Sequence, residues 1–259
     1  MRHRESFDSV ASLYDEYRLP YPPKVVDDVI TSSRLSGGGR VLEIGCGSGQ
    51  LSLPLAEHGV DLIAIELGPR LADLARQKLA PFPNVEVVTS TFEAWPLPAQ
   101  KFDAVVCASA FHWLDPEVRF AKSAEALRAG GSLTVLHVHQ VSGGTPGFVD
   151  ATQPYYMRWG LSDDPSFQLP AAGEVPPTYP ELDLLPYFSS VERHRFEIPR
   201  TLSTSAQIGW LSTDSLILGL NDESRRGFLR DLERLIDSQY GGKVSRNWLY
   251  EVVVARKVP

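Results

Sequence analysis

The sequence predicts an α/β fold built on a doubly wound, mostly parallel sheet. Short apolar runs alternate along the chain with segments of helical periodicity, which is the pattern of repeated strand–helix–strand units. In one of these units, residues 40–79, a glycine-rich turn follows directly after the first strand. At 259 residues and 43% hydrophobic content, the chain is large enough to bury one such core.

The unit at 40–79 has the features of a ligand-binding turn. Its first strand is the apolar run 41–44. Three glycines follow on alternate positions: Gly45, Gly47 and Gly49. Glycine accepts a positive φ and lets the backbone approach a ligand closely. Residues 51–56 then have helical apolar spacing, so we expect the ligand over the N-terminus of that helix. An ordinary strand-to-helix turn is the structural alternative.

Two carboxylates flank this turn and indicate the kind of ligand. Glu66 ends the second apolar run, about 20 residues past the loop, where such units place an acid that accepts hydrogen bonds from ribose hydroxyls. Glu43 lies at the end of the first strand. Its charge would repel a pyrophosphate but suits a cofactor that carries an ammonium and a sulfonium. The pattern therefore favours S-adenosylmethionine over a dinucleotide.

These motifs resemble a known family. The run Glu43-Ile44-Gly45-Cys46-Gly47-Ser48-Gly49, followed by Glu66, resembles motif I and the next acidic position of class I S-adenosylmethionine-dependent methyltransferases. Residues 90–98 and 102–106 resemble the segment after its third strand and its fourth strand. Residues 7–22 and 111–113 resemble the small-molecule branch, type 11, with ubiquinone-type and trans-aconitate-type enzymes. The resemblance covers residues 7–140 well and the last third poorly.

The resemblance implies a Rossmann-like, seven-stranded sheet, mostly parallel with an antiparallel last strand, and helices on both faces. We interpret residues 1–259 as a single domain with an N-terminal cap segment at 1–23 and an inserted substrate lid at 140–186. The lid segment is rich in proline, but its aromatic residues are too many for a disordered linker.

The remaining elements follow from the same periodicities. Strands are expected at 62–65, 84–88, 102–108, 132–136, 191–198 and 247–255, and helices at 7–17, 24–33, 117–127, 151–159, 204–211 and 222–240. By analogy with the family, the last strand lies between the fifth and the sixth. The charges of the helix at 222–240 indicate a solvated face.

On this resemblance, the cofactor site is drawn from the glycine loop, nearby strand ends and the cap segment. The residues assigned to it are Glu43, Gly45, Cys46, Gly47, Gly49, Glu66, Leu67, Phe92, Glu93, Ser109, Tyr14 and Arg18. Phe92 would contact the adenine by stacking or apolar contact, and Glu93 would lie near its exocyclic amine. A surface loop anchored in the core by Trp95 is the alternative for that segment.

His112 is the titratable ring expected at the carboxyl edge of the sheet, with a pKa suited to accepting a proton near pH 7. It is the candidate catalytic base; the alternative is a local structural hydrogen bond. Candidate substrate contacts are Tyr21, Trp113, His137, Tyr155, Arg158 and Trp159. The Asn/Asp-Pro-Pro-Tyr motif, with which methyltransferases hold an exocyclic base amine, is missing here, which argues against adenine or glutamine N-methylation.

The composition indicates which classes of binding partner, and which cellular compartment, to expect for this protein. A net charge of −7 offers no basic footprint for nucleic acid. Two cysteines, Cys46 and Cys107, are too few for a disulfide framework, and no apolar run is long enough to span a bilayer, so we expect a cytoplasmic protein without a membrane partner. His137 and His139 share one strand face, but no third ligand has convincing spacing, so no metal is expected.

The function expected is transfer of a methyl group from S-adenosylmethionine, by in-line displacement, to an O, C or N nucleophile of a small molecule, with S-adenosylhomocysteine as the product. A carboxylate acceptor would use arginines such as Arg18, Arg158 or Arg200, whereas a phenol or carbon acid would use His112. The sequence leaves both open. The alternatives are a non-catalytic regulator that binds the same cofactor and a dinucleotide-binding oxidoreductase.

Overall fold

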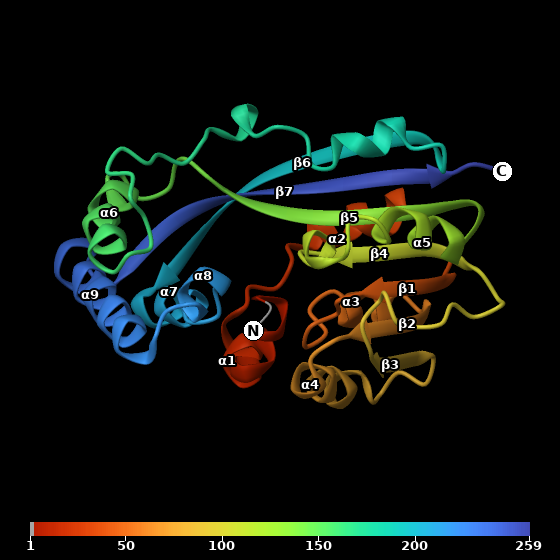
Figure 1. Ribbon diagram of the computed structural model, residues 1–259, viewed down its shortest axis with the longest axis horizontal. Coiled ribbons are helices and arrows are strands. Elements are labelled where there is room, and N and C mark those ends of the chain that lie inside the picture. Colours follow the sequence, from red (N-terminus) through yellow and green to blue (C-terminus); the bar gives the residue numbers. More distant parts are fainter. Residues whose placement is uncertain (1–2) are drawn as a thin grey trace. The chain divides into compact units, whose positions relative to one another are not determined.

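A computed structural model of the chain describes residues 3–259, which form two compact units (Figure 1). The sheet unit comprises Pro20–Val138, Pro177–Phe196 and Tyr250–Pro259. The helical unit comprises the residues up to Leu19, His139–Pro176 and Glu197–Leu249. Three long strands carry residues of both units. The single domain with a cap at 1–23 and a lid at 140–186 stays a prediction.

The sheet has seven strands in the order β3-β2-β1-β4-β5-β7-β6. The strands are β1 Arg40–Ile44, β2 Asp61–Glu66, β3 Val85–Thr89, β4 Phe102–Ala108, β5 Leu127–Val141, β6 Phe188–Ser203 and β7 Lys243–Lys257. β1 pairs in parallel with β2 and β4, β2 with β3, and β4 with β5. β7 lies between β5 and β6, as predicted. The α/β class with a mixed, mostly parallel sheet is therefore confirmed.

The helices follow the expected periodicities closely. The sheet unit contains α2 Pro23–Ser32, α3 Ser52–Glu57, α4 Pro69–Leu79 and α5 Arg119–Ala126. The helical unit contains α1 Ala11–Tyr17, α6 Phe148–Arg158, α7 Thr204–Leu211, α8 Ser215–Leu218 and α9 Asp222–Tyr240. Short 3₁₀ helices are His3–Glu5, Phe7–Val10, Phe111–Trp113, Ala172–Glu174 and Pro180–Leu184. The helix predicted at 7–17 thus begins with a 3₁₀ turn.

β5 is longer than the strand predicted at 132–136, because residues 127–131, with the glycine pair Gly130-Gly131, already belong to the strand. A Cβ on Gly131 would lie 2.9 Å from the carbonyl oxygen of Asp103 on β4. The pairing of β4 with β5 also shifts register between Phe102 and Ala104. Only glycine allows the two backbones to approach this closely at an irregular point of the ladder.

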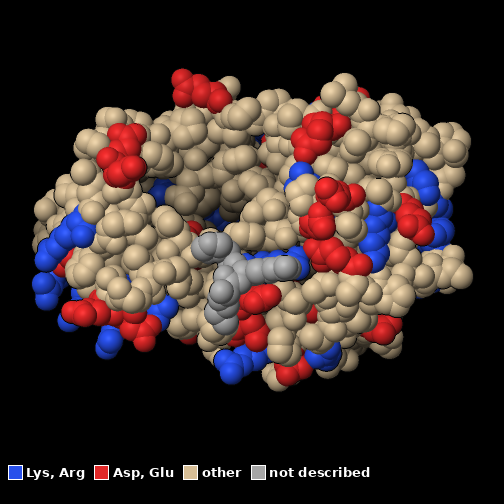
Figure 2. Space-filling view, in the orientation of Figure 1, with Lys and Arg blue, Asp and Glu red and all other residues tan. Residues whose placement is uncertain are grey.

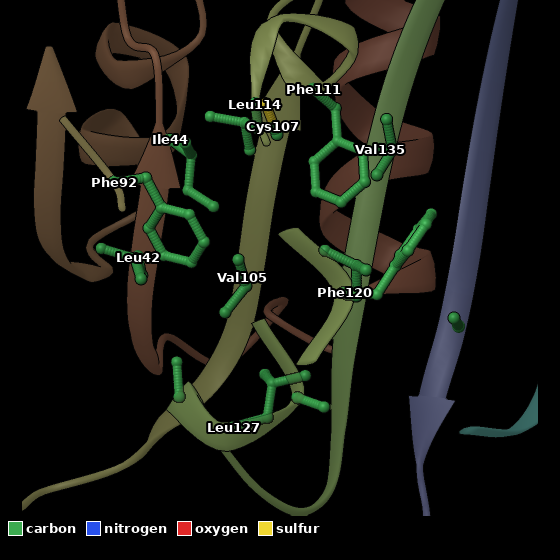
Figure 3. Close-up of a cluster of buried hydrophobic side chains, with 14 of the residues drawn as sticks. Leu42, Ile44, Phe92, Val105, Cys107, Phe111, Leu114, Phe120, Leu127 and Val135 are labelled. Atoms are coloured by element: carbon green, nitrogen blue, oxygen red, sulfur yellow. The ribbon is translucent and has the colours of Figure 1, made fainter. Parts of the chain in front are cut away.

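One apolar cluster of the sheet unit lies on one face of the sheet, where residues two apart in a strand point the same way, while Val41 and Leu62 are buried on the opposite face. Leu42 and Ile44 of β1 belong to it, as do corresponding residues of β4 and β5. Figure 3 shows the aromatic rings of Phe111 and Phe120 on this side, with α2 behind the sheet. The alternation turns Glu43 to the opposite face.

The helical unit has a core of its own. The apolar side of α9 supplies Phe228, Leu232, Leu235 and Ile236, which cluster with Trp210 of α7 and with further apolar residues. The opposite side of α9 exposes charged residues, including Arg226, Arg230 and Glu233, so the predicted solvated face is confirmed. Figure 2 shows acidic and basic side chains interspersed over the visible surface. Within residues 3–259, no helix combines the length and apolar character that crossing a membrane requires.

Candidate functional site

The glycine loop has the backbone conformation that its spacing predicts. Gly45, Gly47 and Gly49 have φ values of 70°, 57° and 90°. The amides of Gly45 and Cys46 donate to the carbonyl of Ile65 at 2.8 and 3.1 Å, which fixes the loop to the end of β2. The loop therefore joins the carboxyl ends of two adjacent parallel strands, where open α/β sheets bind ligands.

Glu66 ties this loop to the next helix. Its carboxylate accepts the amide of Gly47 at 2.9 Å and the amide of Gly68 at 2.8 Å. The side chain is 8% exposed, and Gly68 directly precedes α4. A negative charge is thus held at the end of β2, which is the position predicted for a ribose contact. Leu67, also assigned to the cofactor, lies between Glu66 and Gly68 and is half-buried.

Glu43 is more deeply buried than the sequence indicates. It is 1% exposed, and it accepts a hydrogen bond of 2.6 Å from the hydroxyl of Ser52 in α3. Burial raises the pKa of Glu43 to about 7, with the nearby charge of Glu66 adding to the rise and the Ser52 hydroxyl opposing it. The proposed contact between this carboxylate and a cationic ligand stays a prediction.

Glu43→Gln should stabilise the ligand-free protein at alkaline pH. Because the pKa of Glu43 in the folded state lies above its usual range, the folded state holds this proton more tightly, and stability is lost as pH rises from about 4.5 through 7. Ionising the buried group costs about 3 kcal/mol above pH 7. The thermal midpoint of Glu43→Gln should therefore exceed that of the parent protein at pH 8.5 and equal it at pH 4.5.

The matched control is Glu57→Gln, because Glu57 is an exposed carboxylate at the end of α3. Its thermal midpoint should follow the parent protein at both pH values. A midpoint for Glu43→Gln below that of the parent protein at pH 8.5 would mean that the ionised carboxylate is stabilising, contrary to its burial.

Gly45→Ala should damage the loop at its tightest point. A Cβ on Gly45 would lie 2.6 Å from the Cβ of Ala110, and the residue has a positive φ. Overpacking and the left-handed backbone together should cost about 2–4 kcal/mol. We expect a lower thermal midpoint and at least a tenfold loss of cofactor affinity in calorimetry. Gly59→Ala also changes a glycine of positive φ, but it meets no atom within 4 Å, so it controls for backbone strain alone.

The segment after β3 is held by the core and by a lysine. Phe92 is 2% exposed and belongs to the core cluster, as Figure 3 shows beside Leu42 and Ile44. The carboxylate of Glu93 accepts the amide of Asp115 at 3.1 Å. Lys122 donates to the carbonyl of Glu93 at 2.9 Å. These contacts order the segment, and the adenine contacts assigned to Phe92 and Glu93 stay predictions.

The end of β4 carries backbone strain. Ser109 has a φ of 55°, which is uncommon for a residue other than glycine and is typical of functional sites. The hydroxyl of Tyr21 lies 3.2 Å from the Ser109 hydroxyl. The structure thus brings together two residues that the sequence assigned separately, one to the cofactor and one to the substrate.

His112 lies in a cluster of rings after β4. Its ring centroid lies 4.6 Å from that of Trp113 and 5.5 Å from that of His137. Partial removal from water and the positive charge of Arg119 lower the pKa of His112. The residue as a whole is still exposed, so a neutral imidazole that solvent can reach is expected at pH 7.

Sequence reasoning did not assign Tyr179 or Arg119 to this cluster. Tyr179 is 9% exposed, has a φ of 51°, and packs against Phe111 and His137 at centroid distances of 5.2 and 6.3 Å. The guanidinium of Arg119 lies 5.0 Å from the Tyr179 centroid. Tyr179 is about 65 residues from His112 in the chain, so its only sequence signal was its place in the aromatic segment before β6.

In the helical unit, two predicted cofactor residues pack against each other. The guanidinium of Arg18 lies 5.0 Å from the Tyr14 ring centroid and donates to the carbonyl of Thr213 at 2.5 Å. Their contact with a cofactor stays a prediction.

The predicted substrate residues in α6 and at its C-terminal end contact α9 or the core that α9 builds. Arg158 and the indole of Trp159 both contact the carboxylate of Asp231, at 3.4 and 2.9 Å. Tyr155 packs on the apolar core of the same unit. Their roles toward a substrate stay predictions. Among the residues that the structure describes, no group of His, Cys, Asp and Glu could hold a metal ion, His137 and His139 included.

Sequence comparison finds the Methyltransferase domain family over residues 41–131, the region from β1 to β5. An uncharacterized methyltransferase of Mycobacterium tuberculosis is 28% identical over 215 residues, which are 81% of this chain and 76% of the relative. An uncharacterized methyltransferase of Geobacillus is 32% identical over 133 residues, 50% of this chain and 61% of the relative. The glycine loop and Glu66 fall inside the matched domain.

Solved structures share the fold. One, assigned as a type II methyltransferase from Anaeromyxobacter dehalogenans, has a TM-score of 0.62 at 22% identity, covering 94% of this chain and 99% of that chain. Phosphoethanolamine N-methyltransferase 2 of Haemonchus contortus, in complex with S-adenosylhomocysteine, has a TM-score of 0.56 at 13% identity, covering 97% and 58%.

The strand order, the glycine loop and the acid at the end of β2 together define the fold class of the class I methyltransferases. Residues 41–131 match the methyltransferase domain family, and the chain shares the fold of these enzymes. The resemblance found in the sequence is thereby confirmed, and the small-molecule branch is consistent with these relatives.

Proposed function

We propose that the protein transfers a methyl group from S-adenosylmethionine to a nucleophile of a small molecule. The observation that carries the proposal is the Glu66 carboxylate, held between the amides of Gly47 and Gly68 beside a loop of three positive-φ glycines. A loop of this conformation leaves its backbone open to a ligand, and Glu66 supplies the charge that ribose hydroxyls recognise. The residues present therefore fit this cofactor.

When bound, the cofactor supplies a methyl group made electrophilic by its sulfonium, so the protein needs chiefly to position the acceptor and exclude water. The glycine loop and Glu66 fix the cofactor's ribose end. Glu43 contributes negative charge beneath the loop when it is ionised, which favours a cationic ligand over a pyrophosphate. This electrostatic preference supports S-adenosylmethionine over a dinucleotide.

His112 is the proposed general base. Its lowered pKa keeps the imidazole neutral near pH 7, so its free ring nitrogen accepts a proton from a hydroxyl, amine or carbon acid as the acceptor attacks. His137, whose ring adjoins that of His112, and Trp113 are the proposed neighbours of the substrate. An acceptor that is already ionised would need positioning but no base.

The class of acceptor is supported by the neighbours' names. The related folds include a phosphoethanolamine N-methyltransferase and coclaurine N-methyltransferase, whose names specify small-molecule acceptors. The net charge of −7 supports a small molecule over nucleic acid. Two free, buried cysteines accord with a reducing, cytoplasmic setting.

The test is acceptor-dependent formation of S-adenosylhomocysteine from S-adenosylmethionine by the purified protein. The acceptor panel should contain carboxylic acids, phenols, amines and quinols. Product formation above the rate without acceptor supports the proposal. Cofactor binding without product from any class on the panel would favour the non-catalytic regulator instead.

A further inference from the structure

Tyr179 has an unusual backbone conformation for a large side chain. Its φ of 51° and ψ of 57° lie in the left-handed region, which bulky residues rarely adopt because the Cβ atom crowds the following carbonyl oxygen. The residue directly precedes the 3₁₀ helix Pro180–Leu184 and lies in the sheet unit. Strain of this kind persists only where the surrounding contacts fix the backbone, and it is common at ligand-binding sites.

The backbone around Tyr179 is held by charged side chains of two strands. The buried carboxylate of Glu251 in β7 accepts the amide of Thr178 at 2.9 Å. Arg193 of β6 donates to the carbonyl of Tyr179 at 3.1 Å and to the carboxylate of Asp183 at 2.8 Å. These contacts fix the left-handed turn from both sides, so the place of the Tyr179 side chain does not depend on its own hydroxyl.

The Tyr179 hydroxyl has no hydrogen-bond partner among the residues that the structure describes, although the residue is only 9% exposed. Buried polar groups are almost always hydrogen-bonded, and an exception indicates a ligand or a water that completes the site. Burial raises the pKa of Tyr179, with Cys107 adding to the rise and the positive charge of Arg119 opposing it. The phenol is therefore protonated at physiological pH and can donate a hydrogen bond.

Tyr179 belongs to the ring cluster that contains the proposed base. Its ring is nearly perpendicular to that of His137, at a centroid distance of 6.3 Å, and the His137 ring lies 5.5 Å from that of His112. Phe111 packs on Tyr179 at a centroid distance of 5.2 Å. His112 is exposed and Tyr179 is buried, so the cluster extends from the surface into the sheet unit, to which all four residues belong.

The arginine of this cluster is already paired. Arg119 of α5 forms an ion pair of 3.0 Å with Glu181, and its guanidinium lies 4.8 and 5.0 Å from the ring centroids of Phe120 and Tyr179. A carboxylate acceptor would have to compete with Glu181 for this charge, whereas a neutral hydroxyl needs only a donor and a base. The cluster therefore favours a phenol, whose flat ring also suits the aromatic neighbours.

We propose that the methyl acceptor is a phenol that binds at this ring cluster, and that the Tyr179 hydroxyl donates a hydrogen bond to an oxygen atom of that phenol. Tyr179 is thus a specificity-determining residue, because an acceptor without an oxygen atom leaves the buried hydroxyl unpaired. The inference names the class of the acceptor and in that respect rests on the proposed function. Binding of a phenol at the cluster can nevertheless be measured without methyl transfer.

The experiment measures the binding of phenol to the full chain without cofactor, by calorimetry, with toluene as the analogue that lacks the oxygen atom. Phenol should bind the parent protein saturably and about tenfold more tightly than toluene. Tyr179→Phe removes only the hydroxyl, so it should lower the affinity for phenol to that for toluene and leave toluene binding unchanged. Tyr187→Phe, at a residue that is 38% exposed, is the matched control and should leave both affinities unchanged.

The thermal midpoint separates a ligand-binding hydroxyl from a structural one. Because the Tyr179 hydroxyl has no hydrogen-bond partner among the described residues, the midpoint of ligand-free Tyr179→Phe should equal or exceed that of the parent protein. A lower midpoint in Tyr179→Phe, no binding of phenol to the parent protein, or equal phenol affinity in the two proteins would each overturn the proposal. Failure of the proposed function is distinct, because it would appear as no S-adenosylhomocysteine formed from any acceptor while phenol still binds.

Discussion

Glu66→Ala should weaken S-adenosylhomocysteine binding about 100-fold, or ~3 kcal/mol. Two effects add. The carboxylate is the proposed acceptor for the ribose hydroxyls, and charge-assisted hydrogen bonds of this kind contribute about 1.5–3 kcal/mol. It also accepts the amides of Gly47 and Gly68, so its removal leaves the glycine loop without its anchor. Calorimetric titration of the variant gives the affinity directly.

Glu86→Ala is the matched control for Glu66→Ala. Glu86 is an exposed carboxylate on the adjacent strand β3, and its truncation should leave the dissociation constant unchanged. The dissociation constant of Glu66→Gln should lie between those of Glu66→Ala and the parent protein, because glutamine keeps one acceptor oxygen but not the charge. An unchanged dissociation constant in Glu66→Ala would contradict the assignment of Glu66 as the hydrogen-bond acceptor for the ribose hydroxyls.

His112→Ala should lower turnover about 100-fold while cofactor affinity stays within twofold of the parent protein. General base catalysis typically contributes about 10²–10⁴-fold, and the His112 ring makes its ring contacts with Trp113 and His137, outside the glycine loop. Single-turnover rates with an accepted hydroxyl, amine or carbon acid measure the effect. Equal turnover in His112→Ala would make the residue structural.

The pH profile tests the same assignment independently. His112 acts as a base only when it is neutral, and its pKa is lowered. As the pH is lowered from neutral, the rate should therefore begin to fall only below pH 6.5, the usual pKa of histidine. Arg119→Gln removes one cause of the lowered pKa and should move the acidic limb to higher pH. Arg119→Lys keeps the charge and should leave the limb near its original position. A limb that ignores the charge at residue 119 would contradict the role of His112.

The sequence predicted most of the strands and the glycine loop because both depend on local signals, namely short apolar runs and turns rich in glycine. The place of the last strand between the fifth and the sixth came from the family resemblance, because strand order depends on long-range pairing. The spans of α7 and α9 were predicted to the residue for the same reason. The carboxylate at the end of β2 was identified by its distance from the loop alone.

Features that depend on tertiary packing could not be predicted. The hydrogen bond that Glu43 accepts from Ser52 depends on how α3 packs over β1, which a single sequence does not show. The strain at Ser109 has no signal in a single sequence. Arg246 and Trp210 lie 36 residues apart, and only the fold shows that the guanidinium lies over the indole. The burial of such polar groups is a property of the folded chain.

The central claim is that the loop at residues 45–49 and Glu66 bind S-adenosylmethionine and not a dinucleotide. Calorimetric titration with S-adenosylhomocysteine, run beside NADH, tests it most directly. We expect saturable, micromolar binding of S-adenosylhomocysteine and no heat from NADH beyond dilution. Binding of NADH with no response to S-adenosylhomocysteine would contradict it.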